Sequence, residues 1–109
     1  MTGNSYYGMK NSRMHDKVNK AVKPLTSAQM RAARALIRWS AEDLARETAL
    51  SVTTIRRAEL TDDETSMTTA NDLAVRRALE AAGVDFIDEN GGGPGVRLRQ
   101  RRRPKPPKR

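Results

Sequence analysis

One stretch, from Ser40 to Leu60, constrains this chain more than any other, because it holds two short amphipathic segments that each follow a serine. A serine at the N-cap position accepts a hydrogen bond from a backbone N–H of the first helical turn. Ser40 stands three residues before Asp43 in a variant of the capping box, and it predicts a helix from Ala41 to about Thr48. Small and apolar residues form one narrow face of this helix, which is expected to be buried. The face expected to point into water carries Glu42, Asp43, Arg46 and Glu47.

A second helix is expected from Val52 to about Leu60, capped by Ser51. Neither helix has enough apolar surface to be stable alone, so the two must pack together, and the small Ala45 allows a close approach. Two short helices joined by a tight turn are the geometry of a helix-turn-helix motif. The side of the second helix that is expected to face solvent carries Thr53, Arg56 and Arg57.

Several residues in and around this stretch share the spacing of one family of regulators: Trp39-Ser40, Leu44-Ala45, Leu50-Ser51, Thr54-Ile55 and Glu59. With these residues, the sequence from Leu25 to about Glu80 resembles the Xre family, the lambda-repressor-like helix-turn-helix regulators of bacteria and their phages. The resemblance implies an all-α bundle of about four helices and a sequence-specific DNA-binding transcriptional regulator, a repressor. It also implies a homodimer on a two-fold operator, located in the bacterial cytoplasm and associated with the nucleoid when bound.

The same resemblance implies that the second helix of the motif enters the major groove of double-stranded DNA. Arginine that bonds to O6 and N7 of guanine is the commonest specific contact in that groove. We therefore expect Thr53 and either Arg56 or Arg57 to read bases. The residues implied to meet bases or phosphates are Ser51, Val52, Thr53, Arg56 and Arg57.

Two positions depart from the family pattern. The family usually has glutamine where Ala41 stands, a residue that commonly touches a phosphate, although the backbone donors of a helix N-terminus also attract an anion. Ala41 is therefore kept as a candidate phosphate contact. The family usually has glycine where Ala49 stands in the turn. A residue with a side chain costs about 1–2 kcal/mol in the left-handed conformation, so Ala49 is either mildly strained or sits in a different turn.

A further helix is expected before the motif, from a cap at Thr26 or Ser27 to about Arg38. Three arginines on one of its faces are either solvated or in contact with phosphate, and Arg38 is kept as a candidate phosphate contact. Trp39 is expected to pack between helices with its indole N–H at the rim. The buried stripe is expected to contain Met30, Ala33, Leu36 and Ile37, and the arginine face Arg31, Arg34 and Arg38.

A last helix and a hairpin are expected after an acidic loop at residues 61–67. Thr69 with Asp72 forms another capping box, and it predicts a helix that runs to about Ala82. Apolar residues then alternate in two short segments, residues 84–87 and 96–99, which predicts a β-hairpin. A lone two-stranded hairpin is marginal in water. Its apolar side chains must therefore be covered, either by the last helix or by the hairpin of a second copy.

The net charge of +8 is concentrated at the two ends of the chain. Residues 1–24 carry +4 and are expected to be a disordered basic arm, whereas residues 25–83, the helical domain, carry −1. Residues 84–99 form the hairpin extension, and residues 100–109 a basic, proline-rich tail that does not fold by itself. Long-range attraction to a polyanion is therefore expected from the ends. Candidate phosphate contacts in the tail are Arg101, Arg102 and Arg103.

The residues required for catalysis and for metal binding are largely missing from the sequence. It contains no cysteine, and its single histidine, His15, lies in the basic arm. The three acids of the loop at 61–67 lack the glycine bend of a calcium loop. We expect no enzymatic activity, no metal, no cofactor and no small-molecule ligand. No apolar run approaches the length that spans a membrane, so the chain is expected to be soluble.

Two other functions compete with DNA binding at this point. One is a protein-interaction module, an antitoxin or anti-activator that uses the helix-turn-helix surface against a protein. The other is RNA binding led by the arginine-rich tail.

Overall fold

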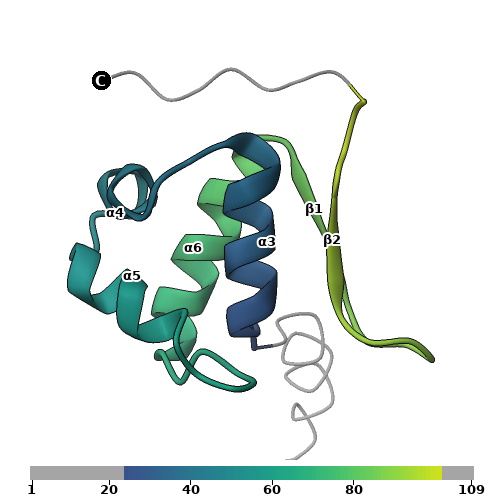
Figure 1. Ribbon diagram of the computed structural model, residues 1–109, viewed down its shortest axis with the longest axis horizontal. Helices are drawn as coiled ribbons and strands as arrows, with labels where there is room; N and C mark the ends of the chain where they lie inside the picture. The colour runs from purple at the N-terminus through teal and green to yellow at the C-terminus, as the bar shows by residue number, and fades with distance from the viewer. Residues whose placement is uncertain (1–23, 102–109) are drawn as a thin grey trace, which may run out of the picture.

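The computed structural model describes residues 24–101; residues 1–23 and 102–109, and with them Arg102, Arg103 and nearly all of the expected basic arm, lie outside the described residues. The described chain folds into a helical bundle followed by a small antiparallel sheet, as the sequence predicted (Figure 1). In Figure 1, α4 and α5 lie on one side of α3 and α6, and the sheet lies on the other. The elements are α3 (Ser27–Ile37), α4 (Ala41–Thr48), α5 (Val52–Ala58), α6 (Thr69–Ala81), β1 (Val84–Ile87) and β2 (Gly95–Leu98).

Side-chain caps define the starts of the helices. Ser40 and Asp43 form the expected capping box at α4, and the Ser51 hydroxyl accepts from the Thr54 amide at 3.0 Å to open α5. Thr26, rather than Ser27, caps α3. The cap expected for α6 was wrong by one residue, because Thr68 accepts from the Asn71 amide at 3.1 Å while the Asp72 side chain points into the core.

Two residues with side chains adopt the left-handed conformation where helices end. Ala49, with φ 61° and ψ 23°, ends α4 and begins the turn to α5. The sequence left two alternatives for this turn, a mildly strained Ala49 or a different turn. The first is confirmed, because Ala49 adopts the left-handed conformation. Arg38, with φ 63°, ends α3 and turns the chain over the helix end, where the Trp39 amide donates to the Arg34 carbonyl at 3.0 Å.

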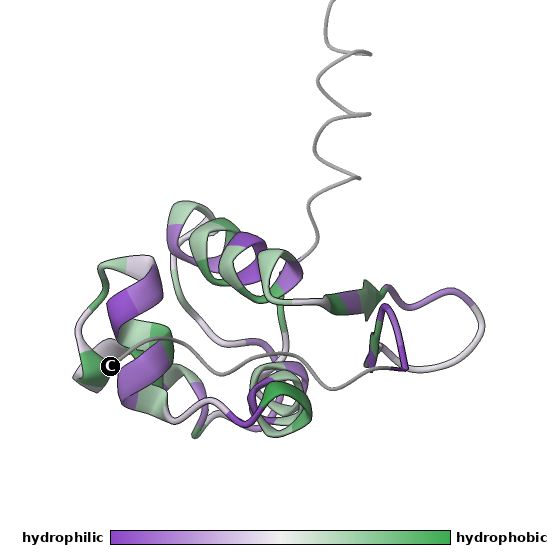
Figure 2. Cartoon of the chain, turned by 90° about the horizontal axis from the view of Figure 1, so that it is seen from above, coloured by the Kyte–Doolittle hydropathy of each residue, from purple (hydrophilic) through white to green (hydrophobic). Residues whose placement is uncertain are grey.

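A single core joins the helices and the hairpin. Figure 2 shows hydrophobic and hydrophilic residues alternating around the helices, as expected when each helix buries one face. Trp39 is buried in this core, and its Nε1 has no acceptor among the described residues, so the expectation that the indole N–H lies at the rim was wrong. The largest fully buried apolar side chains are Leu25, Met30, Ile37, Leu44, Ile55, Val75, Leu79 and Val84.

The hairpin is covered by helices of its own subunit. β1 contacts α6 and α3, β2 contacts α3, and Phe86, Val96 and Leu98 pack against the core. The Gln29 amide on α3 also donates to the Gly95 carbonyl at 3.1 Å. The last helix, one of the two alternatives for cover, therefore contributes through its contact with β1, and α3 contributes as well. The second strand begins and ends one residue earlier than expected, because Ile87 pairs with Gly95 and Val84 with Leu98.

Asp72 is a buried carboxylate that ties three segments together. Its Oδ1 accepts from the Thr65 hydroxyl at 2.6 Å, and its Oδ2 accepts from the Leu25 amide at 3.4 Å. Burial raises the pKa of Asp72, while the bonds from Thr65 and Leu25 act in the opposite direction.

Among the described residues, no helix combines the length and the apolar character that crossing a membrane requires.

Replacing Ala49 by glycine should stabilise the fold. Glycine adopts the left-handed conformation without a clash of Cβ, so Ala49→Gly is expected to raise the free energy of unfolding by up to about 1 kcal/mol. Urea unfolding monitored by circular dichroism measures this change. Ala35→Gly is the matched control: Ala35 is exposed within α3, where glycine should instead destabilise by about 1 kcal/mol. A loss of stability in both variants would contradict the strain assigned to Ala49.

The raised pKa of Asp72 should appear in the pH dependence of stability. A carboxyl whose pKa is higher in the folded state binds a proton there first, so its contribution to stability falls as pH rises from its ordinary pKa through the raised one. Asp72→Asn removes this titration and keeps acceptor and donor groups near Thr65 and Leu25. The variant should therefore gain stability relative to the wild type as pH rises through this window. Urea unfolding at several pH values tests this, and a constant difference between the two proteins would contradict it.

Candidate functional site

The outer face of α5 is the best candidate site in the part of the chain that the structure describes. α5 buries Ile55 and Ala58 toward the core, so its opposite side points away from the rest of the subunit. Of the five positions expected to meet DNA, Val52 is half-buried and the other four are exposed: Ser51, Thr53, Arg56 and Arg57. The fold therefore brings these residues together on one short, capped helix.

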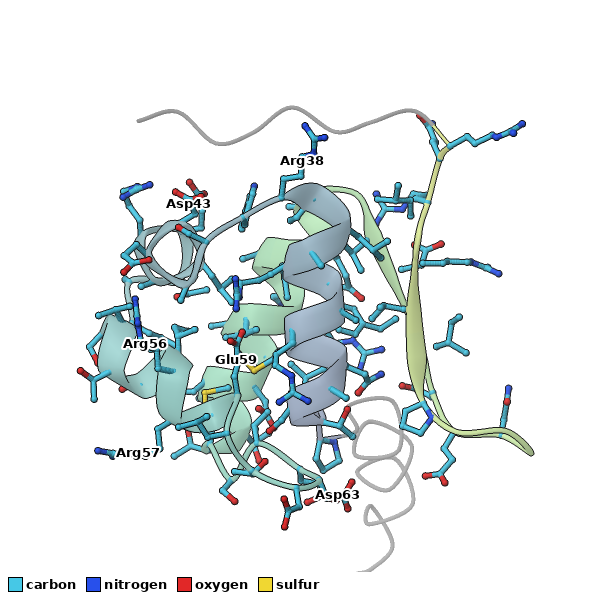
Figure 3. All side chains as sticks on the ribbon, viewed as in Figure 1. Arg38, Asp43, Arg56, Arg57, Glu59 and Asp63 are labelled. Atoms are coloured by element: carbon cyan, nitrogen blue, oxygen red, sulfur yellow. The ribbon has the colours of Figure 1, made fainter. Side chains whose placement is uncertain are left out.

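The two arginines of this face differ in their surroundings. Figure 3 shows Arg57 pointing away from the body of the protein and Arg56 pointing toward α4. Nη2 of Arg56 donates to Oε2 of Glu42 on α4, and each of these side chains is 56% exposed. Arg57 is exposed and forms no ion pair among the described residues. The sequence did not indicate the pairing of Arg56, because its partner lies 14 positions earlier on a different helix.

The first turn of α4 carries two acidic side chains, Glu42 and Asp43. The pKa of Glu42 is lowered, first by a hydrogen bond from its own backbone N–H and also by Arg56. Asp43 was expected to face water but is buried, because Oδ2 accepts from the Ser40 amide at 3.0 Å and Oδ1 pairs with Arg46 at 2.6 Å. Ala41 is itself buried beside these two acids. This arrangement does not favour a phosphate at the start of α4.

A second ion pair fixes the end of α5 to α3. The guanidinium of Arg34 meets the carboxylate of Glu59 through two bonds, Nη2 to Oε1 at 2.7 Å and Nε to Oε2 at 2.8 Å. Nη1 of Arg34 donates to the Trp39 carbonyl at 2.9 Å, and Arg31 donates to the Glu59 carbonyl. The hydrogen bond to Glu59 raises the pKa of Arg34. Glu59 is one of the residues on which the family resemblance rests, but the sequence did not indicate that Arg34 is its partner.

The arginine face expected on α3 therefore separates into two parts. Arg34 is half-buried in its bonds to Glu59, which do not fit the expected solvation or phosphate contact, whereas Arg31 donates to the Glu59 carbonyl and remains exposed. Arg38 is exposed at the end of α3 nearer the start of α4, and it remains available to an anion (Figure 3). Arg101, the last described residue, is also exposed.

A shallow groove adjoins α5 where α3, α4 and α5 meet. It has a volume of about 470 Å³ and contains both charged and apolar groups. Leu60, at its edge, is 82% exposed and is the large hydrophobic residue that the described chain leaves most open to water. The groove is lined by Arg34, Ser40, Ala41, Glu42, Arg56, Glu59 and Leu60.

Comparison of the sequence with models of protein families gives no match, and neither does comparison with curated proteins. A proposal of function therefore depends on the arrangement of side chains around α4 and α5.

Proposed function

We propose that α4, the turn at Ala49 and α5 form a helix-turn-helix motif, and that the protein is a sequence-specific DNA-binding transcriptional regulator that acts as a repressor. The observation that carries the proposal is the exposed outer face of α5, where Thr53, Arg56 and Arg57 stand together and no described part of the subunit covers them.

The dimensions of α5 suit the major groove. An α-helix with its side chains is about 10–12 Å across, and the major groove of B-DNA is about 12 Å wide. Packing on α4 and the ion pair between Arg34 and Glu59 hold the helix at a defined angle to the body. A recognition helix that is positioned before DNA arrives loses less conformational freedom on binding, which favours affinity.

Different residues serve affinity and selectivity in this proposal. Arg56, Arg57 and Thr53 meet base edges, whereas Ser51 and Arg38 approach the phosphate backbone beside them. Arg101 and the basic tail that follows it strengthen binding to any sequence, because neutralised phosphates release counterions. The protein binds as a homodimer on two half-sites about 34–36 Å apart, because one short helix reads too few base pairs to select a site.

The test is selection of bound duplexes from a random pool, followed by titration of single base-pair variants of the recovered site. Arg56→Ala and Arg57→Ala should each relax preference at one base pair, by about 1–3 kcal/mol for an arginine that reads guanine. Removing residues 102–109 should weaken binding to all duplexes alike and flatten the dependence of binding on salt.

Arg77→Ala is the matched control, since Arg77 is an exposed arginine on α6 outside the proposed interface. It should leave the preference unchanged. A tail deletion that abolishes preference, combined with arginine variants that keep it, would refute the proposed roles.

A protein-interaction module, an antitoxin or anti-activator, is the second candidate function. The groove beside α5 and the 82% exposed Leu60 favour it, because exposed apolar groups next to a groove are typical of protein-binding surfaces. In that case the random pool should show no enrichment. Capture of a protein partner should then be lost in Leu60→Ser and kept in Arg57→Ala, as a pull-down with each purified variant would measure.

A further inference from the structure

We infer that Glu42 determines sequence specificity by holding Arg56 in place for a base edge. This inference rests on the proposed function. The sequence predicted only that Glu42 faces water, and the inference assigns it a role in specificity.

The geometry of the ion pair leaves Arg56 able to read a base while it remains bound to Glu42. An arginine side chain has five N–H donors, and the pair with Glu42 uses Nη2. The guanine edge requires two donors, for O6 and N7. Arg56 can therefore bond to guanine and Glu42 at the same time. Both side chains are 56% exposed, so solvent and a ligand can reach the guanidinium.

The carboxylate also lowers the tendency of Arg56 to bind phosphate. Glu42 carries a negative charge at neutral pH, as glutamate does there, and its pKa is lowered further. A phosphate that approached Arg56 would meet this charge as well, and like charges repel. A guanine edge has acceptor atoms but no net charge, so it is not repelled in the same way. Glu42 therefore favours the base over the backbone as the partner of Arg56.

Arg57 lacks such a partner among the described residues, although it is the next residue on the same helix. Its side chain extends away from the body (Figure 3). Without an acid to hold it, the guanidinium of Arg57 keeps its rotamer freedom and can reach more than one acceptor. The two adjacent arginines thus differ: Glu42 holds Arg56 toward one base edge, whereas Arg57 meets its base without such a partner.

The experiment compares Glu42→Gln with Glu47→Gln on the full chain. Glu47 is an exposed acid on the same helix α4 and forms no ion pair among the described residues, so its substitution changes net charge equally. Three probes are used: a duplex recovered from the random pool, its single base-pair variants, and a scrambled duplex of equal length. Circular dichroism melting checks that both variants fold as the wild type does.

Glu42→Gln should lower the preference at the base pair read by Arg56 on the order of tenfold, whereas Glu47→Gln should keep it. On the scrambled duplex, Glu42→Gln should steepen the log–log salt slope by about 0.9, because the released Arg56 neutralises one more phosphate. In the Arg56→Gln background, Glu42→Gln should change neither quantity more than Glu47→Gln does.

Each contrary outcome has a distinct meaning. If the pool is enriched but Glu42→Gln behaves like Glu47→Gln, the inference is wrong and the proposed function stands. If Glu42→Gln lowers the preference equally in the Arg56→Gln background, Glu42 does not act through Arg56, and the inference is also wrong. If the wild type enriches no duplex, the proposed function fails and the inference fails with it.

Discussion

The ion pair between Arg34 and Glu59 decides where α5 points. The side chain of Glu59 is only 8% exposed, and a carboxylate removed from water costs several kcal/mol unless a well-placed partner compensates. Arg34 does so with two bonds, one to each carboxylate oxygen, which define the orientation of the two groups as well as their distance. The end of α5 is therefore held at one place on α3, and the side of α5 opposite the core remains in solvent.

Other charged side chains of the described chain also form ion pairs within the subunit. Asp43 meets Arg46, Glu42 meets Arg56, and Asp85 meets both Arg99 at 3.0 Å and Arg97 at 3.7 Å. Arg97 and Arg99 thus pair within the hairpin extension that the sequence predicted at residues 84–99. Because the helical body is nearly neutral, it exerts little long-range attraction on a polyanion.

Local rules predicted the helices well and failed where a distant partner competed. Ser40 and Ser51 cap helices as expected, since each cap requires only residues two or three positions away. Asp72 satisfied the same local rule as the N3 residue of a capping box. Its carboxylate instead bonds to Leu25 and Thr65, and the helix begins one residue earlier. The indole N–H of Trp39 likewise lies deeper than its sequence position indicated, because burial depends on how the helices pack around the ring.

The sequence by itself determined which residues lie on the outer side of α5, because a 3.6-residue period and a serine cap are properties of the segment alone. It also determined that a hairpin follows the last helix. Only the tertiary structure decided which acid meets which arginine. Glu42 and Arg56 are 14 positions apart, and Arg34 and Glu59 are 25 apart. Such pairs depend on how the helices pack, and the spacing of residues within one helix contains no information on that packing.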